Sequence, residues 1–134
     1  MSVLDRKRIL ILEDEVLLAL EASDTMEELG AIIVGPVHRV EAAMALLDGV
    51  RPDAALLDVN IAGTTSASVA ERLARDNIPF VLATGYGSRT EIAGGRTIID
   101  KPYNRRQLQA AFREIFCEEE ALPLQQKLAA VGGR

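Results

Sequence analysis

The chain has 134 residues, of which 49% are apolar and only 4% aromatic, so its length and composition predict a single domain with an aliphatic core. Its formal net charge of −5 argues against a protein that binds nucleic acid through a basic face. The single cysteine, Cys117, excludes an internal disulfide, and no apolar run approaches the length that spans a membrane. We therefore expect a cytoplasmic protein that binds neither nucleic acid nor membranes.

The first part of the chain predicts two strands with a helix between them. A run of branched apolar residues covers 9–12, and a segment of helical periodicity follows at 16–29. A second apolar run, 31–34, ends at Gly35-Pro36. Because proline is tolerated only at the end or the edge of a sheet, we expect this second run to be an edge strand that stops there.

Strand-like runs and helical patterns continue to alternate through the rest of the chain: helix 40–47, strand 54–57, helix 69–73, strand 80–83, strand 97–99 and helix 108–115. Asn104, with Gln107 three residues later, predicts a capped start for the last helix. We expect Cys117 to pack at the end of that helix. Residues 118–134 are predicted to be a loose extension, with no output domain.

The strands are apolar throughout and do not alternate with polar residues, which indicates a parallel sheet covered by helices on both faces. In such folds ligands bind outside the carboxyl ends of the strands. Polar groups follow four of the five expected strands at this edge, namely Glu13-Asp14, Asp58, Thr84 and Lys101. We expect these side chains to lie together, and lone His38 to be a surface loop residue.

Three carboxylates give this group of residues a formal charge of −3, which Lys101 reduces to −2. Carboxylate oxygens with this excess of negative charge suit Mg²⁺, which prefers a few protein carboxylates together with water and a phosphate. Thr84 supplies a hydroxyl and Lys101 a point charge, and both can hold phosphate oxygens. Phosphoryl transfer needs mainly this positioning and neutralisation of charge.

At these residues the chain resembles the receiver domains of two-component response regulators. The resemblance rests on Glu13-Asp14, Asp58, Thr84 and Lys101-Pro102 in this order along the chain, and it covers residues 5–117. It implies a flavodoxin-like, doubly wound α/β fold with a five-stranded parallel sheet in the order 2-1-3-4-5. It also implies a partner that donates a phosphoryl group, either a sensor histidine kinase or a histidine phosphotransferase.

The resemblance also implies roles for single residues. Asp58 would accept the phosphoryl group, and Asp14 and Asp58 would bind Mg²⁺ directly. Glu13 would act on the Mg²⁺ through water, and Asn60 through its backbone carbonyl. Thr84 would be the switch hydroxyl and Lys101 would contact the phosphoryl group. The peptide bond before Pro102 would be cis, as it is in the family.

The chain departs from the family pattern at several positions. Ala62 stands where the family usually has proline, and Ile98 stands in place of the aromatic switch residue. The stretch from Thr84 to Lys101 is short and glycine-rich, so the fourth helix should be short or irregular. The motif at 82–86 is similar to the Phe-Ala-Thr-Gly-Tyr signature of single-domain regulators, many of them alphaproteobacterial, that work with less common kinases. Its last residue, Tyr86, is either a packing residue or an aromatic gate over the phosphoryl site.

Three functions compete on this sequence. The first is a phosphorylation switch whose output is contact with a downstream protein, or which serves as a phosphate sink or relay. The second is a Mg²⁺-dependent phosphohydrolase, which would need an acid two residues after Asp58, where Asn60 stands. The third is a nucleotide-binding protein, but no phosphate-binding glycine motif opens a helix in this chain.

Overall fold

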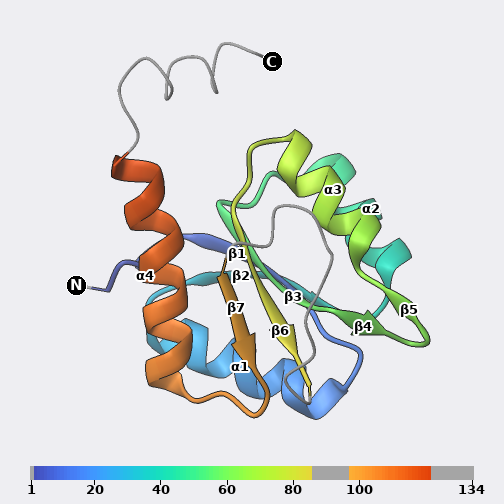
Figure 1. Cartoon of the computed structure of the whole chain (residues 1–134), viewed down its shortest axis with the longest axis horizontal. Coiled ribbons are helices and arrows are strands. Elements are labelled where there is room, and N and C mark those ends of the chain that lie inside the picture. The colour runs from blue at the N-terminus through green and yellow to red at the C-terminus, as the bar shows by residue number, and fades with distance from the viewer. Residues whose placement is uncertain (1, 86–96, 122–134) are drawn as a thin grey trace.

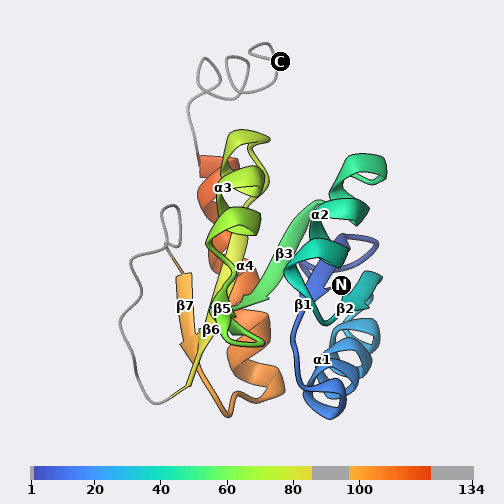
Figure 2. The same cartoon turned by 90° about the vertical axis from the view of Figure 1, so that its right-hand side faces the viewer.

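The computed structural model describes residues 2–85 and 97–121 of the chain. Its main sheet has five parallel strands, in the order β2-β1-β3-β6-β7. The strands are β1 (Arg8–Leu12), β2 (Ile32–Val37), β3 (Ala54–Asp58), β6 (Phe80–Thr84) and β7 (Thr97–Asp100). Because β6 and β7 are the fourth and fifth strands of this sheet along the chain, the observed order confirms the predicted flavodoxin-like order. Figure 2 shows β2 and β7 at the two edges of the sheet.

Helices cover both faces of the sheet (Figure 1). They are α1 (Val16–Glu28), α2 (Val40–Gly49), α3 (Ala67–Arg75) and α4 (Arg105–Ala121). α1 and α4 pack on one face against Ile9 and Ile11 of β1, and α2 and α3 pack on the other face against Leu10 and Leu12. Successive residues of a strand point to opposite faces. β1 is apolar from Ile9 to Leu12 because each face of the sheet has its own buried core.

The prediction that the second strand ends before Gly35-Pro36 is wrong. β2 is an edge strand, as expected, but it continues through this pair to Val37. Leu10 pairs with Val34 and Leu12 with Val37, so β2 accommodates one extra residue as a bulge. Gly35 has φ of +103°, a backbone conformation that favours glycine. The missing N–H of Pro36 is tolerated because an edge strand has a free side.

A short antiparallel hairpin, which the sequence analysis did not predict, follows β3. Its strands are β4 (Asn60–Ile61) and β5 (Thr64–Thr65), and the turn between them consists of Ala62 and Gly63. Both turn residues have positive φ, +50° and +84°, as in the tight turns that suit β-hairpins. We call residues Asn60–Thr65 the β4–β5 hairpin. Each strand has two residues, which is too short for a periodic signal in the sequence.

Two further predictions fall mainly on residues outside the described part of the chain. The predicted short or irregular helix falls on residues 86–96, and most of the predicted extension falls on 122–134, so both lie outside the described residues. α4 continues past Cys117 to Ala121. Cys117 itself is exposed, so the expectation that it packs against the core is wrong. Among the described residues, no helix is both long and apolar enough to cross a membrane.

The predicted cap of the last helix is confirmed, and it supports a test of stability. The Gln107 N–H donates to Asn104 Oδ1 and the Asn104 N–H donates to Gln107 Oε1, both at 2.8 Å. This reciprocal pair satisfies two backbone N–H groups at the start of α4. We expect Asn104→Ala to lower the free energy of unfolding by about 1 kcal/mol in urea denaturation. Arg106→Ala, at an exposed position of the same turn, is the control, and equal losses in the two variants would contradict the cap.

Candidate functional site

The predicted polar residues gather at the carboxyl edge of the sheet, because parallel strands all end there. Glu13 directly follows β1, and its N–H donates to the Val37 carbonyl at 3.0 Å. Asp58 is the last residue of β3 and is in register with Ala83 of β6. The Lys101 N–H, just after β7, donates to the Thr84 carbonyl at 2.7 Å. Backbone hydrogen bonds of the sheet therefore fix the backbone positions from which the side chains of Glu13, Asp58 and Lys101 extend.

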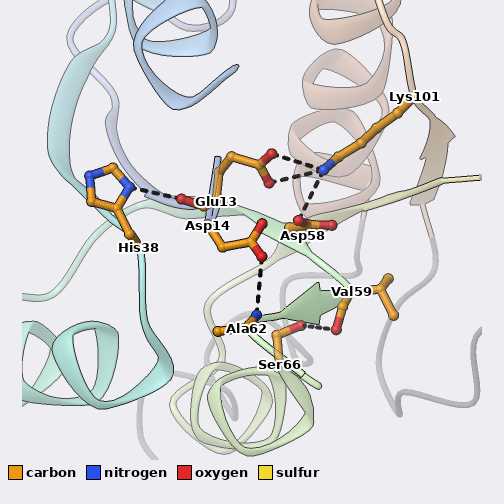
Figure 3. Close-up of polar contacts among 8 residues, drawn as sticks. All are labelled: Glu13, Asp14, His38, Asp58, Val59, Ala62, Ser66 and Lys101. Carbon is orange, nitrogen blue, oxygen red and sulfur yellow. Dashed lines mark hydrogen bonds and ion pairs between the residues drawn. The ribbon is translucent and has the colours of Figure 1, made fainter. Parts of the chain in front are cut away.

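Lys101 joins the two buried carboxylates of this edge (Figure 3). Its Nζ lies 2.9 Å from Asp58 Oδ2 and 2.9 Å from each carboxylate oxygen of Glu13. The side chains of Glu13 and Asp58 are only 5% and 8% exposed, and that of Lys101 is 20% exposed. A single ammonium group is therefore shared by two carboxylates that have little access to water.

Asp14 completes a cluster of three acids, which we call the acidic cluster: Glu13, Asp14 and Asp58. One carboxylate oxygen from each lies within 4.8 Å of the others. Burial raises the pKa of Glu13 to about 8, the neighbouring Asp58 adds to the rise, and Lys101 opposes it. With Lys101 the formal charge is −2, and a divalent cation with a preference for oxygen ligands would neutralise it. The donor set therefore fits Mg²⁺.

Lys101 stays protonated in this setting. Burial lowers the pKa of Lys101, but the hydrogen bonds to Asp58 and Glu13 outweigh burial and raise it overall. Tyr103 lies close by and is partly buried against the core on the α1 and α4 face. Burial, assisted by the charge of Glu13, raises the pKa of Tyr103 to about 12, so its hydroxyl remains neutral. The fixed positive charge of the site therefore comes from Lys101.

One side chain and one backbone N–H contact the adjacent residues Glu13 and Asp14. His38 is a half-buried loop residue directly after β2, and its Nδ1 donates to the Glu13 carbonyl at 2.9 Å. The Ala62 N–H donates to Asp14 Oδ2 at 3.1 Å. Sequence reasoning missed both contacts, although the replacement of the usual proline by Ala62 was a visible signal.

A cavity of about 720 Å³ opens beside the cluster. Its lining comes from α1, the start of α4 and the ends of the strands, and includes Asp14, Asp58, Asn60, Gly85 and Lys101. Asn60 is exposed at the start of β4, two residues after Asp58 along the chain. The cavity thus borders both members of the Asp58–Lys101 ion pair.

The remaining predicted site residues are placed as follows. Thr84 is buried at the end of β6, only 2% exposed, and is in register with Asp100 of β7. The Lys101-Pro102 peptide bond is cis, the isomer that the family resemblance implies. Ile98, in the place of the usual aromatic residue, is 44% exposed on β7. Tyr86, the possible aromatic gate, lies outside the described residues.

Comparison with solved structures finds close similarity of fold. The solution structure of SdrG from Sphingomonas melonis Fr1 is 39% identical, with a TM-score of 0.74, and the match covers 87% of this chain and 99% of that one. The crystal structure of a mutant of the anti-anti-sigma factor PhyR from Bartonella quintana is 26% identical, with a TM-score of 0.76. That match covers 90% of this chain and 52% of that one.

Comparison of sequences leads to the same family. The transcriptional regulatory protein PdtaR of Mycobacterium tuberculosis is 29% identical over 136 residues, and the match covers 91% of this chain but only 66% of that protein. The family model for the response regulator receiver domain matches residues 9–113. The matched segment contains all four helices in part or whole and every residue of the acidic cluster. The chain therefore belongs to the response regulator receiver domain family.

Proposed function

We propose that this chain is a phosphorylation switch that accepts a phosphoryl group on Asp58 in a Mg²⁺-dependent reaction. The observation that carries the proposal is the position of Asp58, which is buried, paired with Lys101 at 2.9 Å and within reach of two further carboxylates at the mouth of a cavity. The donor would be the phosphohistidine of a sensor histidine kinase or of a histidine phosphotransferase. Acceptance of a phosphoryl group from phosphohistidine is the chemistry expected of the response regulator receiver domain family, to which the chain belongs.

In this reaction an oxygen of Asp58 forms the new bond to phosphorus while the bond between phosphorus and the histidine nitrogen breaks. Asp14, Asp58 and the backbone carbonyl of Asn60 would hold Mg²⁺, with Glu13 acting through water. The bound cation would neutralise charge on the transferring group. The Lys101 ammonium would move from its contact with the Asp58 carboxylate to the phosphoryl oxygens, and the Thr84 hydroxyl would turn toward them.

The output would be contact with a downstream protein, or transfer of the phosphoryl group in a sink or relay. The PhyR relative is described as an anti-anti-sigma factor, a function exerted on another protein, which supports the first alternative. The described part of the chain shows no helix that could span a membrane. The net charge of −5 also disfavours direct contact with nucleic acid.

A small phosphodonor such as acetyl phosphate tests the proposal. With MgCl₂ present, the protein should gain one phosphoryl group by intact mass, and the adduct should be stable in acid and labile in base, as an acyl phosphate is. Peptide mapping should place it on Asp58. Chelation of divalent cations with EDTA should prevent the reaction. Equal labelling with and without EDTA, or a phosphoryl group on serine or threonine, would refute the proposed function.

A second experiment concerns the ammonium group of Lys101. We expect Lys101→Met, which keeps an apolar stem of similar length, to accept the phosphoryl group but to lose most of the accompanying change in amide chemical shifts around Thr84. The reason is that the new charge has no ammonium to attract, although the backbone bond from residue 101 to Thr84 remains. Lys7→Met is the control, because Lys7 precedes the amino end of β1 whereas the acidic cluster lies at the carboxyl end. If Lys101→Met showed the full change in amide chemical shifts on phosphorylation, Lys101 would not be the group that couples phosphorylation to the change around Thr84.

A further inference from the structure

The β4–β5 hairpin reaches back to the acidic cluster through one hydrogen bond. The Ala62 N–H, at the first turn position, donates to Asp14 Oδ2 at 3.1 Å across 48 residues of chain. In Figure 3 the other carboxylate oxygen of Asp14 lies on the side of Asp58. One oxygen of Asp14 is therefore held by the hairpin while the other remains directed toward the cluster.

The position of the hairpin is itself set by buried contacts. Ile61, next to the turn, is only 1% exposed and belongs to the core on the α2 and α3 face. At the base of the hairpin the Ser66 N–H donates to the Val59 carbonyl at 2.9 Å, and the Val59 N–H donates to the Ala83 carbonyl of β6 at 3.0 Å. The donor at position 62 is thus tied both to the core and to the main sheet.

The backbone at position 62 is in a conformation that an ordinary residue rarely adopts. Ala62 has φ of +50° and Gly63 has φ of +84°. Alanine in this region is strained by contact between its Cβ and the backbone. The strain is tolerated in a turn that points the Ala62 N–H at Asp14, and the family's usual proline at this position would have no N–H to donate.

We propose that the Ala62 N–H is a positioning group for the cation site, holding Asp14 in the orientation that binds Mg²⁺. Asp14 is more exposed than Glu13 and Asp58, so without this bond its side chain would be free to rotate in solvent. A hydrogen bond that orients a ligand before the cation arrives lowers the entropy lost on binding. The proposal rests on the proposed function, because it assumes that the acidic cluster binds Mg²⁺.

The hydrogen bond between the Ala62 N–H and Asp14 also predicts an effect of Mg²⁺ on the hairpin. If the hairpin favours the binding orientation of Asp14, then Mg²⁺ must stabilise the hairpin by the same free energy, because coupling between two sites is symmetric. The Ala62 amide of the unmodified protein should therefore exchange more slowly with solvent when Mg²⁺ is present. This effect can be measured without any change in the protein.

The direct test removes only the N–H. Replacing Ala62 by lactic acid, which turns the peptide bond between Ile61 and Ala62 into an ester, deletes the donor and keeps the side chain. We expect the dissociation constant for Mg²⁺, measured by calorimetry or NMR titration, to rise roughly 10- to 100-fold, as it does when other outer-shell partners are lost. Ala62→Gly is the matched control, since it keeps the N–H and relieves the strain, and it should bind Mg²⁺ at least as tightly as the unmodified protein.

Each outcome separates the positioning role from the proposed function. Unchanged Mg²⁺ affinity in the ester protein would overturn the role of Ala62 while leaving the proposed function in place. Absence of Mg²⁺ binding in the unmodified protein would refute the cation site and the positioning role together. If the ester protein fails to fold, exchange of the Ala62 amide in the unmodified protein, with and without Mg²⁺, tests the positioning role instead. Exchange at Ala62 that is the same with and without Mg²⁺ would overturn the proposal, and slower exchange with Mg²⁺ would support it.

Discussion

Replacement of Asp58 by asparagine is expected to abolish phosphoryl acceptance and to leave the fold intact. Asparagine has the shape of aspartate, but its amide oxygen is a poor nucleophile, so no stable adduct forms. Lys101 keeps both hydrogen bonds to Glu13 at 2.9 Å in the variant. The loss of one carboxylate from a crowded group also relieves repulsion, so the melting temperature should not fall.

The measurement is intact mass after incubation with a small phosphodonor and MgCl₂. Asp24→Asn is a suitable control, because Asp24 lies exposed on α1 and the substitution makes the same chemical change. The control should be labelled like the unmodified protein, and Asp58→Asn should show no adduct. A labelled Asp58→Asn protein would mean that another carboxylate, with Asp14 the first to test, accepts the phosphoryl group.

The second large effect is expected for Asp14→Asn, which should weaken Mg²⁺ binding at least about tenfold, a change of about 1.4 kcal/mol. The acidic cluster and Lys101 have a formal charge of −2, so Mg²⁺ brings the site to zero, whereas in the variant the same cation leaves an excess of +1. The amide oxygen of asparagine can still accept the Ala62 N–H. The variant therefore removes the charge of Asp14 without removing its contact with the β4–β5 hairpin.

Without Mg²⁺ the same substitution should stabilise the protein. The Asp14 carboxylate adds a third negative charge to the two that Lys101 contacts, and one oxygen of each of the three acids lies within 4.8 Å of the others. Removing one charge should raise the melting temperature by a few degrees, since about 1 kcal/mol corresponds to roughly 2–8 °C in domains of this size range. Glu15→Gln, at the exposed neighbouring residue, is the control.

These two effects have opposite signs, which makes the Asp14→Asn experiment decisive. A generally disruptive mutation would lower both Mg²⁺ affinity and stability, whereas a cation ligand in a repulsive group should lower the first and raise the second. Calorimetry with Mg²⁺ and thermal unfolding in EDTA measure the two quantities separately. Unchanged Mg²⁺ affinity together with undiminished phosphorylation would rule out Asp14 as a ligand.

The amino-acid sequence by itself was enough to place the acidic cluster at one edge of a parallel sheet. The strands around Ile9 and Leu56 are apolar on both faces, and each runs into acids, so strand type and polar ends are local features of the chain. Parallel strands share one carboxyl edge, and this geometric fact brings Glu13, Asp58 and Lys101 together without any knowledge of loops. The structure agrees with this grouping, with Lys101 bonded to both acids.

Tertiary structure alone decided how these residues are held. The hydrogen bonds from Lys101 to Glu13 join residues 88 positions apart, and the bond from Ala62 to Asp14 joins residues 48 positions apart. No local pattern encodes such contacts, because they depend on where separate strands and turns meet in space. The bulge that carries β2 through Gly35-Pro36 depends on pairing with β1, and the β4–β5 hairpin is too short for a periodic signal. Local periodicity thus determines strands and their ends, whereas the orientation of a carboxylate depends on partners that only the folded chain brings near.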